Sequence, residues 1–234
     1  MFCDHTYLKK TDITHQDMTK LPQGVQDLFA KRGTKYVVAQ HSFPENPTDI
    51  TARIFEPDVE DDAYAGPIWM SYRHGMSVTK LDDGRTVFIA GEHEDYYDPC
   101  FFIYNDVWVW DGSSLKIYGY PYHVFPATDF HRAILIGKHI WTIGALGYSA
   151  GSKKDKPIQV CRLDTETMKM ELLRPTGDCP KWLWFDHSMC RGNVCELLEG
   201  RKIYVKDGGG GDEYVLDTDT LVWEKLQNKL MVIA

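Results

Sequence analysis

An acidic and aromatic stretch carries the clearest recognition chemistry in this sequence. It occupies residues 92–104, and its binding candidates are Glu92, Glu94, Asp95, Tyr96, Tyr97, Asp98, Phe101 and Phe102. Rings beside a charged rim are typical of protein interfaces, where aromatic side chains act as anchors. The carboxylates lack the glycine-centred spacing of a calcium loop. We therefore expect a protein-binding loop without a metal. The alternative is that the rings pack inward and the carboxylates are only solvated.

A second group of candidates combines guanidinium groups with rings. Arg73 and Arg132 could bind carboxylates as bidentate forks, and Tyr120 and Tyr122 belong to a second aromatic stretch. Together with Glu92, the arginines could line a pocket for an anionic sugar. The same residues could contact a protein, so a binding protein and a carbohydrate-active enzyme stand as competing hypotheses.

Three histidines follow one another at intervals of 57 and 56 residues: His74, His131 and His187. If equivalent positions surround an axis, their imidazoles could hold a transition metal. The alternative, which we favour, is that each ring has a structural role, and we predict no metal.

Two further patterns resemble reactive sites without completing one. Cys190 and Cys195 lie near His187 in sequence, but no third residue is evident to orient a covalent catalyst. The glycine-rich run 207–213 lacks the Lys-Ser/Thr pair of a phosphate loop and leads into a strand. We therefore predict no catalytic residue and no cofactor.

These candidates need a scaffold to position them, and the sequence indicates a repeated one. Four aspartates recur every 53 residues, each after a short β-type run: Asp58, Asp111, Asp164 and Asp217. A turn glycine precedes an apolar run in each unit: Gly33, Gly84, Gly137 and Gly200. Glycine tolerates the positive φ of tight hairpins, and the β-branched and aromatic residues that follow suit buried strands. Internal periods of this length indicate a propeller or a related array.

The repeats resemble the kelch family over residues 33–226. The matching segments are RHGMSVTKLDDGRTVFIAGE, YNDVWVWD, FHRAILIGKHIWTIGALG and EYVLDTDTLVWEKL. The family's glycine pair is altered to Gly91-Glu92 in one unit, and the tryptophan after the aspartate is replaced by Ile117 and Met170 in the middle units. The resemblance implies an all-β fold, a small propeller of about four blades, and a structural role for the early histidine.

We expect a single domain over residues 1–234. Its predicted parts are an N-terminal arm and helix (1–32), a partial first unit (33–66), and units at 67–122, 123–176 and 177–234, the last with a closing strand. The helix is predicted because apolar residues recur at helical spacing and a proline fits the first turn: Leu21, Val25, Leu28 and Phe29, with Pro22.

The composition narrows the classes of function. Hydrophobic residues make up 43% and aromatic residues 13% of the chain, which favours a folded, strand-rich protein. The net charge of -8 argues against a nucleic-acid partner and suits a basic one. No secretion signal or membrane-spanning apolar run is evident, and the six scattered cysteines suit a reducing compartment. A cytoplasmic protein is expected.

The leading hypothesis is a non-catalytic, kelch-like propeller whose loops grip a protein partner. Two alternatives remain open at this point. The resemblance allows a carbohydrate-active enzyme such as a sugar mutarotase or epimerase, and the acidic balance allows a bacterial immunity or inhibitor protein that masks a basic toxin. The sequence also leaves open whether the four units close one propeller ring or whether a second copy of the chain is needed to complete it.

Overall fold

The computed structural model of the chain describes residues 12–13, 22–32, 43–55, 69, 71, 73–93, 102–146, 155–185 and 192–226. Most of them lie in antiparallel β-strands, with two short helices, α1 (Gln23–Arg32) and α2 (Thr51–Phe55). The predicted all-β class is therefore confirmed. Among the described helices, none is long and apolar enough to cross a membrane.

Three four-stranded antiparallel meanders form the body of the protein. The first sheet contains β3 (Ser77–Lys80), β4 (Thr86–Ile89), β7 (Asp106–Trp110) and β8 (Leu115–Gly119). The second contains β9 (Arg132–Ile136), β10 (His139–Ile143), β11 (Val160–Asp164) and β12 (Met170–Leu172). The third contains β14 (Val194–Leu198), β15 (Lys202–Lys206), β16 (Glu213–Asp217) and β17 (Val222–Leu226).

Five shorter strands extend or connect these sheets. β1 (Asp12–Ile13) pairs with β3, β2 (Thr48–Asp49) pairs with β8, and β13 (Thr176–Gly177) runs parallel to β17. β5 (Glu92–His93) and β6 (Phe102–Ile103) pair with each other in the connection from β4 to β7.

The strand sequences differ according to how many of their faces are covered. β4 (TVFI) and β7 (DVWVW) are buried at every position, as continuous apolar runs of β-branched and aromatic residues predict for strands covered on both faces. β15 (KIYVK) alternates instead, with Ile203 and Val205 buried between more exposed residues. This period of two indicates a sheet with one covered face.

Each sheet turns back between its third and fourth strands at an aspartate. In all three turns the Oδ1 atom accepts two backbone N–H bonds, from Ser113 and Ser114 to Asp111, from Glu166 and Thr167 to Asp164, and from Asp219 and Thr220 to Asp217. Such side-chain bonds replace backbone pairing in tight turns. Three of the four recurring aspartates are thus confirmed at one equivalent turn, whereas Asp58 lies outside the described residues.

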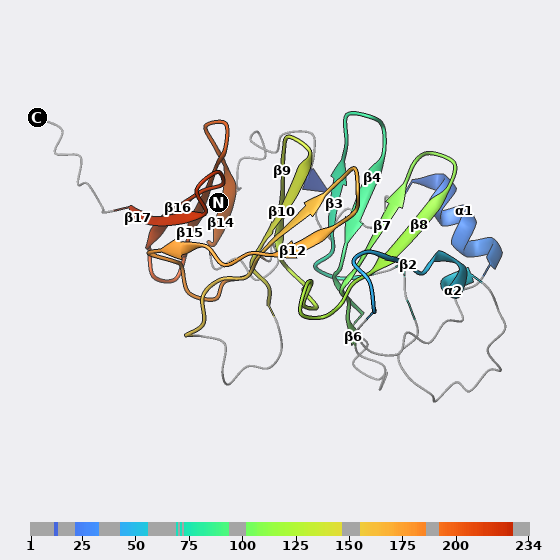
Figure 1. Cartoon of the computed structure of the whole chain (residues 1–234), viewed down its shortest axis with the longest axis horizontal. Helices are drawn as coiled ribbons and strands as arrows, with labels where there is room; N and C mark the ends of the chain where they lie inside the picture. Colours follow the sequence, from blue (N-terminus) through green and yellow to red (C-terminus); the bar gives the residue numbers. More distant parts are fainter. Residues whose placement is uncertain are drawn as a thin grey trace, which may run out of the picture.

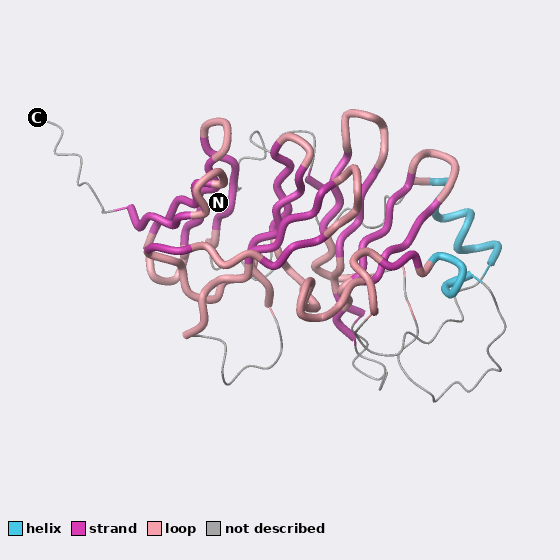
Figure 2. The backbone as a smooth tube through the Cα atoms, in the orientation of Figure 1, coloured by secondary structure: helices cyan, strands magenta, loops and turns pink. Residues whose placement is uncertain are grey.

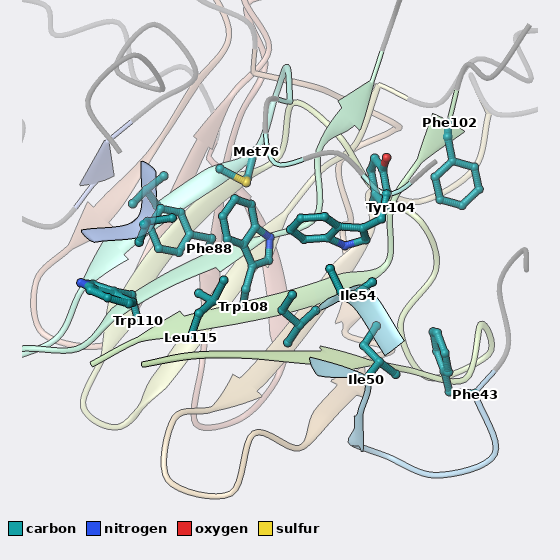
Figure 3. Close-up of a cluster of buried hydrophobic side chains, with 14 residues drawn as sticks. Phe43, Ile50, Ile54, Met76, Phe88, Phe102, Tyr104, Trp108, Trp110 and Leu115 are labelled. Carbon is teal, nitrogen blue, oxygen red and sulfur yellow. The ribbon is translucent and has the colours of Figure 1, made fainter. Parts of the chain in front are cut away.

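The hydrophobic core consists of layers that lie between and beside the sheets. The first layer packs one face of the first sheet against α1, α2 and the segments around them, and Figure 3 shows its rings and aliphatic side chains. Within it, Trp108 stacks on Phe88 with ring centroids 4.5 Å apart. The second layer joins the first and second sheets, and the third layer joins the second and third sheets.

The three sheets lie side by side in a row, in chain order (Figure 1). β9 contacts both β3 and β14, so the first strands of the sheets approach one another along a common line. The predicted count of about four blades is not confirmed. Residues 43–55 of the expected first unit form β2 and α2 instead: β2 extends the first sheet beside β8, and Phe43, Ile50 and Ile54 pack on the outer face of that sheet.

The predicted N-terminal helix is confirmed as α1. The N–H groups of Val25 and Gln26 donate to the carbonyl oxygen of Pro22, which places the proline at the start of the helix. Val25 is fully buried against the first sheet. The predicted closing strand near residue 231 lies outside the described residues.

Candidate functional site

The two edges of the row of sheets are built differently. Connections at one edge are short turns, at residues 81–85, 111–114, 137–138, 165–169, 199–201 and 218–221. Four of the five connections at the other edge are long, at residues 90–105, 120–131, 144–159 and 173–193, and the fifth, at residues 207–212, is short. We call this second edge the long-loop edge; for the first two sheets it lies below the strands in Figures 1 and 2. Loops held by a rigid scaffold are where binding residues concentrate, so this edge is the candidate site.

The acidic and aromatic stretch begins at the long-loop edge as a small hairpin. The backbone groups of Glu92 and His74 exchange two hydrogen bonds of 2.8 Å, and β5 then pairs with β6. Only the ends of the stretch can be placed. The predicted binding residues Glu94, Asp95, Tyr96, Tyr97, Asp98 and Phe101 lie outside the described residues.

Gly91 fixes the point where this hairpin leaves the first sheet. Its φ is 91°, its N–H donates to Thr128 O at 2.9 Å, and its carbonyl accepts the N–H of Tyr104 at 2.9 Å. A Cβ atom at this position would lie 2.7 Å from the Cβ of Met76. Glycine is required here both by the positive φ and by the close approach of the neighbouring chain.

Arg73 does not line an open pocket, because its side chain is completely buried. Its guanidinium group makes a two-pronged ion pair with Asp106, with Nη2 lying 2.8 Å from Oδ2. Its Cζ atom lies 3.4 Å from the ring centroid of Tyr104, and Trp69 Nε1 donates to the same carboxylate at 2.7 Å. A buried charge is stable in a protein only when it is paired in this way, so Arg73 has a structural role. The prediction that Arg73 lines a pocket for an anionic sugar is therefore not supported.

Three more predicted binding residues are enclosed by the protein. Glu92 is 1% exposed, Phe102 packs edge-on against Tyr104 at 4.7 Å, and the hydroxyl group of Tyr120 donates to Met168 O at 2.8 Å. Burial raises the pKa of Tyr120 well above its usual value. These side chains face the interior of the protein, so they can support recognition only by holding the connections in place.

Two predicted residues remain accessible at the long-loop edge. Tyr122 is 50% exposed in the connection from β8 to β9, and Arg132, the first residue of β9, is half-buried. Tyr122 is one of only three large hydrophobic side chains that are exposed among the residues that the structure describes. It is therefore the best-placed predicted contact.

Sequence reasoning missed a group of half-buried aromatic residues at the same edge: Phe130, Trp182 and Trp184. Trp182 Nε1 donates to Leu146 O at 3.2 Å, which ties two connections together, and Asn193 Nδ2 donates to Trp184 O at 2.9 Å within one of them. Phe130 has a φ of 46°, an uncommon conformation for a bulky residue and one that is frequent at functional sites. Of the three, only Phe130 falls within a segment that carries the kelch resemblance, FHRAILIGKHIWTIGALG.

Backbone hydrogen bonds between the sheets define which residues are equivalent. The N–H of Phe130 donates to Gly75 O at 2.9 Å, and the N–H of Phe185 donates to Phe130 O at 2.7 Å. These three residues therefore occupy the same place in successive units. The predicted alignment of His74 with His131 is wrong, because His74 precedes Gly75 whereas His131 follows Phe130.

His131 lies inside the protein rather than in a ring of ligands. Its Nε2 atom is 2.8 Å from Ser77 Oγ, and burial lowers the pKa of the imidazole to about 3. His187 is outside the described residues. Among the described residues, no three His, Cys, Asp or Glu side chains are grouped so that they could hold a metal.

The cysteine and glycine patterns have structural explanations where they can be seen. Cys195 is buried in β14 against the second sheet, while Cys190 lies outside the described residues. The glycine run connects β15 to β16 as expected: Asp207 Oδ1 accepts the N–H of Gly209 at 2.9 Å, and Asn193 Oδ1 accepts the N–H of Gly208.

Comparisons with known proteins support the resemblance to the kelch family. No protein-family model matches the chain. Over 136 residues it is 29% identical to Kelch domain-containing protein 3 of Rattus norvegicus and of Mus musculus, and 28% identical to that of Bos taurus. The aligned part is 58% of this chain and 34% of each relative, so the chain spans about a third of the length of the curated relatives it matches. The solved structure of YjhT aligns with 66% of this chain and 50% of that chain, at 12% identity and a TM-score of 0.38.

Proposed function

We propose that this kelch-like chain is a protein-binding module whose partner contacts the long-loop edge. The observation that carries the proposal is the asymmetry between the two edges. One edge consists of short turns, three of them closed by an aspartate, and the other carries longer connections with one exposed and several half-buried aromatic residues. The kelch resemblance supports a binding role by analogy only, since a fold alone does not define a function.

The accessible residues suit a protein partner. Tyr122, Phe130 and Trp184 provide rigid aromatic surface, which loses little conformational entropy on binding. The chain carries a net charge of -8, so a partner surface with basic residues would be attracted to it. We include Arg132 in the surface as a candidate contact for a carboxylate of the partner.

A photo-crosslinking amino acid tests the location of the contact. Placed at Tyr122, it is expected to capture a protein partner in cells. Placed at Asp83, whose side chain is 51% exposed in the turn between β3 and β4 at the opposite edge, it is expected to capture none. Equal capture at both positions, or none at Tyr122, would overturn the proposal.

The stretch between β5 and β6 stays a prediction for the same surface. Replacing Tyr96 and Tyr97 with alanine is expected to weaken partner binding and to leave the thermal midpoint unchanged. If the midpoint falls by several degrees while binding to the captured partner survives, the stretch has a structural role and the surface is restricted to the other connections.

A further inference from the structure

The third sheet differs from the other two in what covers its second face. In the first sheet, Ile89 and Val107 pack against the second sheet. In the second sheet, Ile143 and Val160 pack in the same way against the third. Beyond the third sheet no further sheet is present in the described part of the chain, and this sheet forms one end of the row (Figure 1). We call its second side the end face.

The strand register shows how the end face differs from the corresponding faces of the first two sheets. Ile89 pairs with Val107 across β4 and β7, and Ile143 pairs with Val160 across β10 and β11. At the same place in the third sheet, Lys206 pairs with Glu213, and their charged atoms are 3.1 Å apart. An ion pair at this place would lose hydration beneath an apolar sheet. The end face is therefore not built to receive another sheet like the first two.

The end face is nevertheless not a plain solvated surface. Leu198 and Val222 are 39% and 41% exposed, and they are two of the three exposed large hydrophobic residues among those that the structure describes. The strand register places both in one row, Leu198–Lys202–Asp217–Val222. A second row repeats the pattern with Val194–Lys206–Glu213–Leu226. In each row a lysine and a carboxylate lie side by side between two apolar residues.

We propose that the end face binds the end face of a second copy of this chain. A two-fold axis parallel to the strands, between β15 and β16, places each row over the same row of the other copy in reverse order. Lys202 then faces Asp217 of the other copy, Lys206 faces Glu213, and Leu198 faces Val222. This self-complementarity of charge and apolar surface is what an isologous interface requires.

The middle row fits the same arrangement. It consists of Glu196, Tyr204, Val215 and Glu224. The axis brings Tyr204 to the centre, over Val215 of the other copy, which is only 8% exposed and adds little new contact. It leaves the two glutamates at the margins, where water screens their repulsion. Two sheets packed face to face with nearly aligned strands are a common arrangement. A second copy thus takes the position that a following sheet has elsewhere in the row, and this does not depend on the proposed partner at the long-loop edge.

Sedimentation velocity over a range of concentrations tests the interface. The wild-type chain is expected to form a dimer, and Leu198→Asp and Val222→Asp are each expected to weaken it by at least about tenfold, which is 1.4 kcal/mol. Tyr122→Asp is the control, since Tyr122 is also exposed but lies at the long-loop edge. A wild-type monomer at every concentration, or a dimer that both end-face variants leave intact, would overturn the proposal.

A charge exchange tests the orientation of the two copies. Lys206→Glu places two carboxylates opposite each other across the interface and is expected to weaken the dimer. Adding Glu213→Lys restores both the pair within the chain and the pair between copies, so the double variant is expected to dimerise again. Mixing Leu198→Cys with Val222→Cys and adding a short bis-maleimide, which spans the roughly 10 Å between packed sheets, is expected to link the two variants to each other, whereas neither variant alone is linked to itself through the new cysteine. Failure of both the rescue and the cross-link would refute this orientation.

Discussion

Acidification is expected to destabilise the protein through His131. The imidazole is buried, and burial lowers its pKa in the folded state to about 3, compared with 6.5 for an exposed histidine. In the folded protein His131 therefore stays neutral down to about pH 3, while in the unfolded chain it takes up a proton below pH 6.5. The stability that depends on a neutral His131 is fully present above pH 6.5 and is lost as the pH falls from 6.5 towards 3.

The magnitude follows from the two pKa values. Each unit of separation corresponds to roughly 1.4 kcal/mol, and at pH 5 the expected loss in the free energy of unfolding is about 2 kcal/mol relative to pH 7.5. The aspartates at the three turns have lowered pKa values as well, but they affect stability only as the pH falls below their ordinary value of 3.8. The interval between pH 7.5 and pH 5 therefore isolates the histidines.

Urea unfolding at pH 7.5 and at pH 5 provides the assay. The variant His131→Gln keeps a polar group beside Ser77 and cannot titrate, so its loss of stability between the two pH values is expected to be about 2 kcal/mol smaller than that of the wild type. His139→Gln is the comparison, because burial also lowers the pKa of His139 but its side chain is 30% exposed; its effect is expected to be smaller. An NMR titration of the wild-type imidazoles serves as a second readout. A normal pKa for His131, or the same pH dependence in His131→Gln and wild type, would refute the reasoning.

Three further substitutions test contacts in and beside the first sheet by thermal or urea unfolding. Gly91→Ala is expected to destabilise the protein far more than Gly84→Ala, because both positions have positive φ but only the first new Cβ meets other atoms; equal losses would contradict the close approach at Gly91. Arg73→Met leaves Asp106 buried without its cation and is expected to cost roughly 3–5 kcal/mol; a change below about 1 kcal/mol would show that solvent reaches this pair. Tyr120→Phe removes the hydrogen bond to Met168 O and is expected to cost about 1 kcal/mol with no change in partner binding, and a loss of binding would instead mark Tyr120 as a contact residue.

Local turn chemistry was predictable from the sequence. Asp111, Asp164 and Asp217 each bond to backbone N–H groups two and three residues ahead, so the few residues around each aspartate are enough to specify the turn. The same is true of α1, whose apolar spacing and proline lie within one segment.

Equivalence between units was harder to predict, because it depends on the lengths of the turns. The turn from β3 to β4 occupies residues 81–85, whereas that from β9 to β10 occupies only residues 137–138. The interval between equivalent residues therefore changes along the unit: it is 53 residues from Gly84 to Gly137 but 55 from Gly75 to Phe130. The interval of 57 residues from His74 to His131 is close to both, and it suggests an equivalence that the backbone bonds do not support.

The candidate site was the least predictable part, because long-range pairing decides which side chains remain accessible. Arg73 is enclosed by Asp106 and by rings from distant segments, and Tyr120 finds its acceptor in the second sheet. Nothing in the neighbouring sequence distinguishes Tyr120 from Tyr122, yet one is fully buried and the other is half exposed. Similarly, the sequence assigns no role in binding to Trp182 or Trp184, and only the fold brings them to the long-loop edge.

The backbone bonds that link Gly75, Phe130 and Phe185 have a consequence for how the protein opens. They join each sheet only to its immediate neighbour, so the loss of one sheet disrupts the next interface and not the one beyond it. Opening of the third sheet breaks a single layer of the core, whereas opening of the second breaks two. Amide hydrogens in β10 and β11 should therefore exchange more slowly than those in β15 and β16, and a ligand or second copy bound to the end face would slow exchange in the third sheet first.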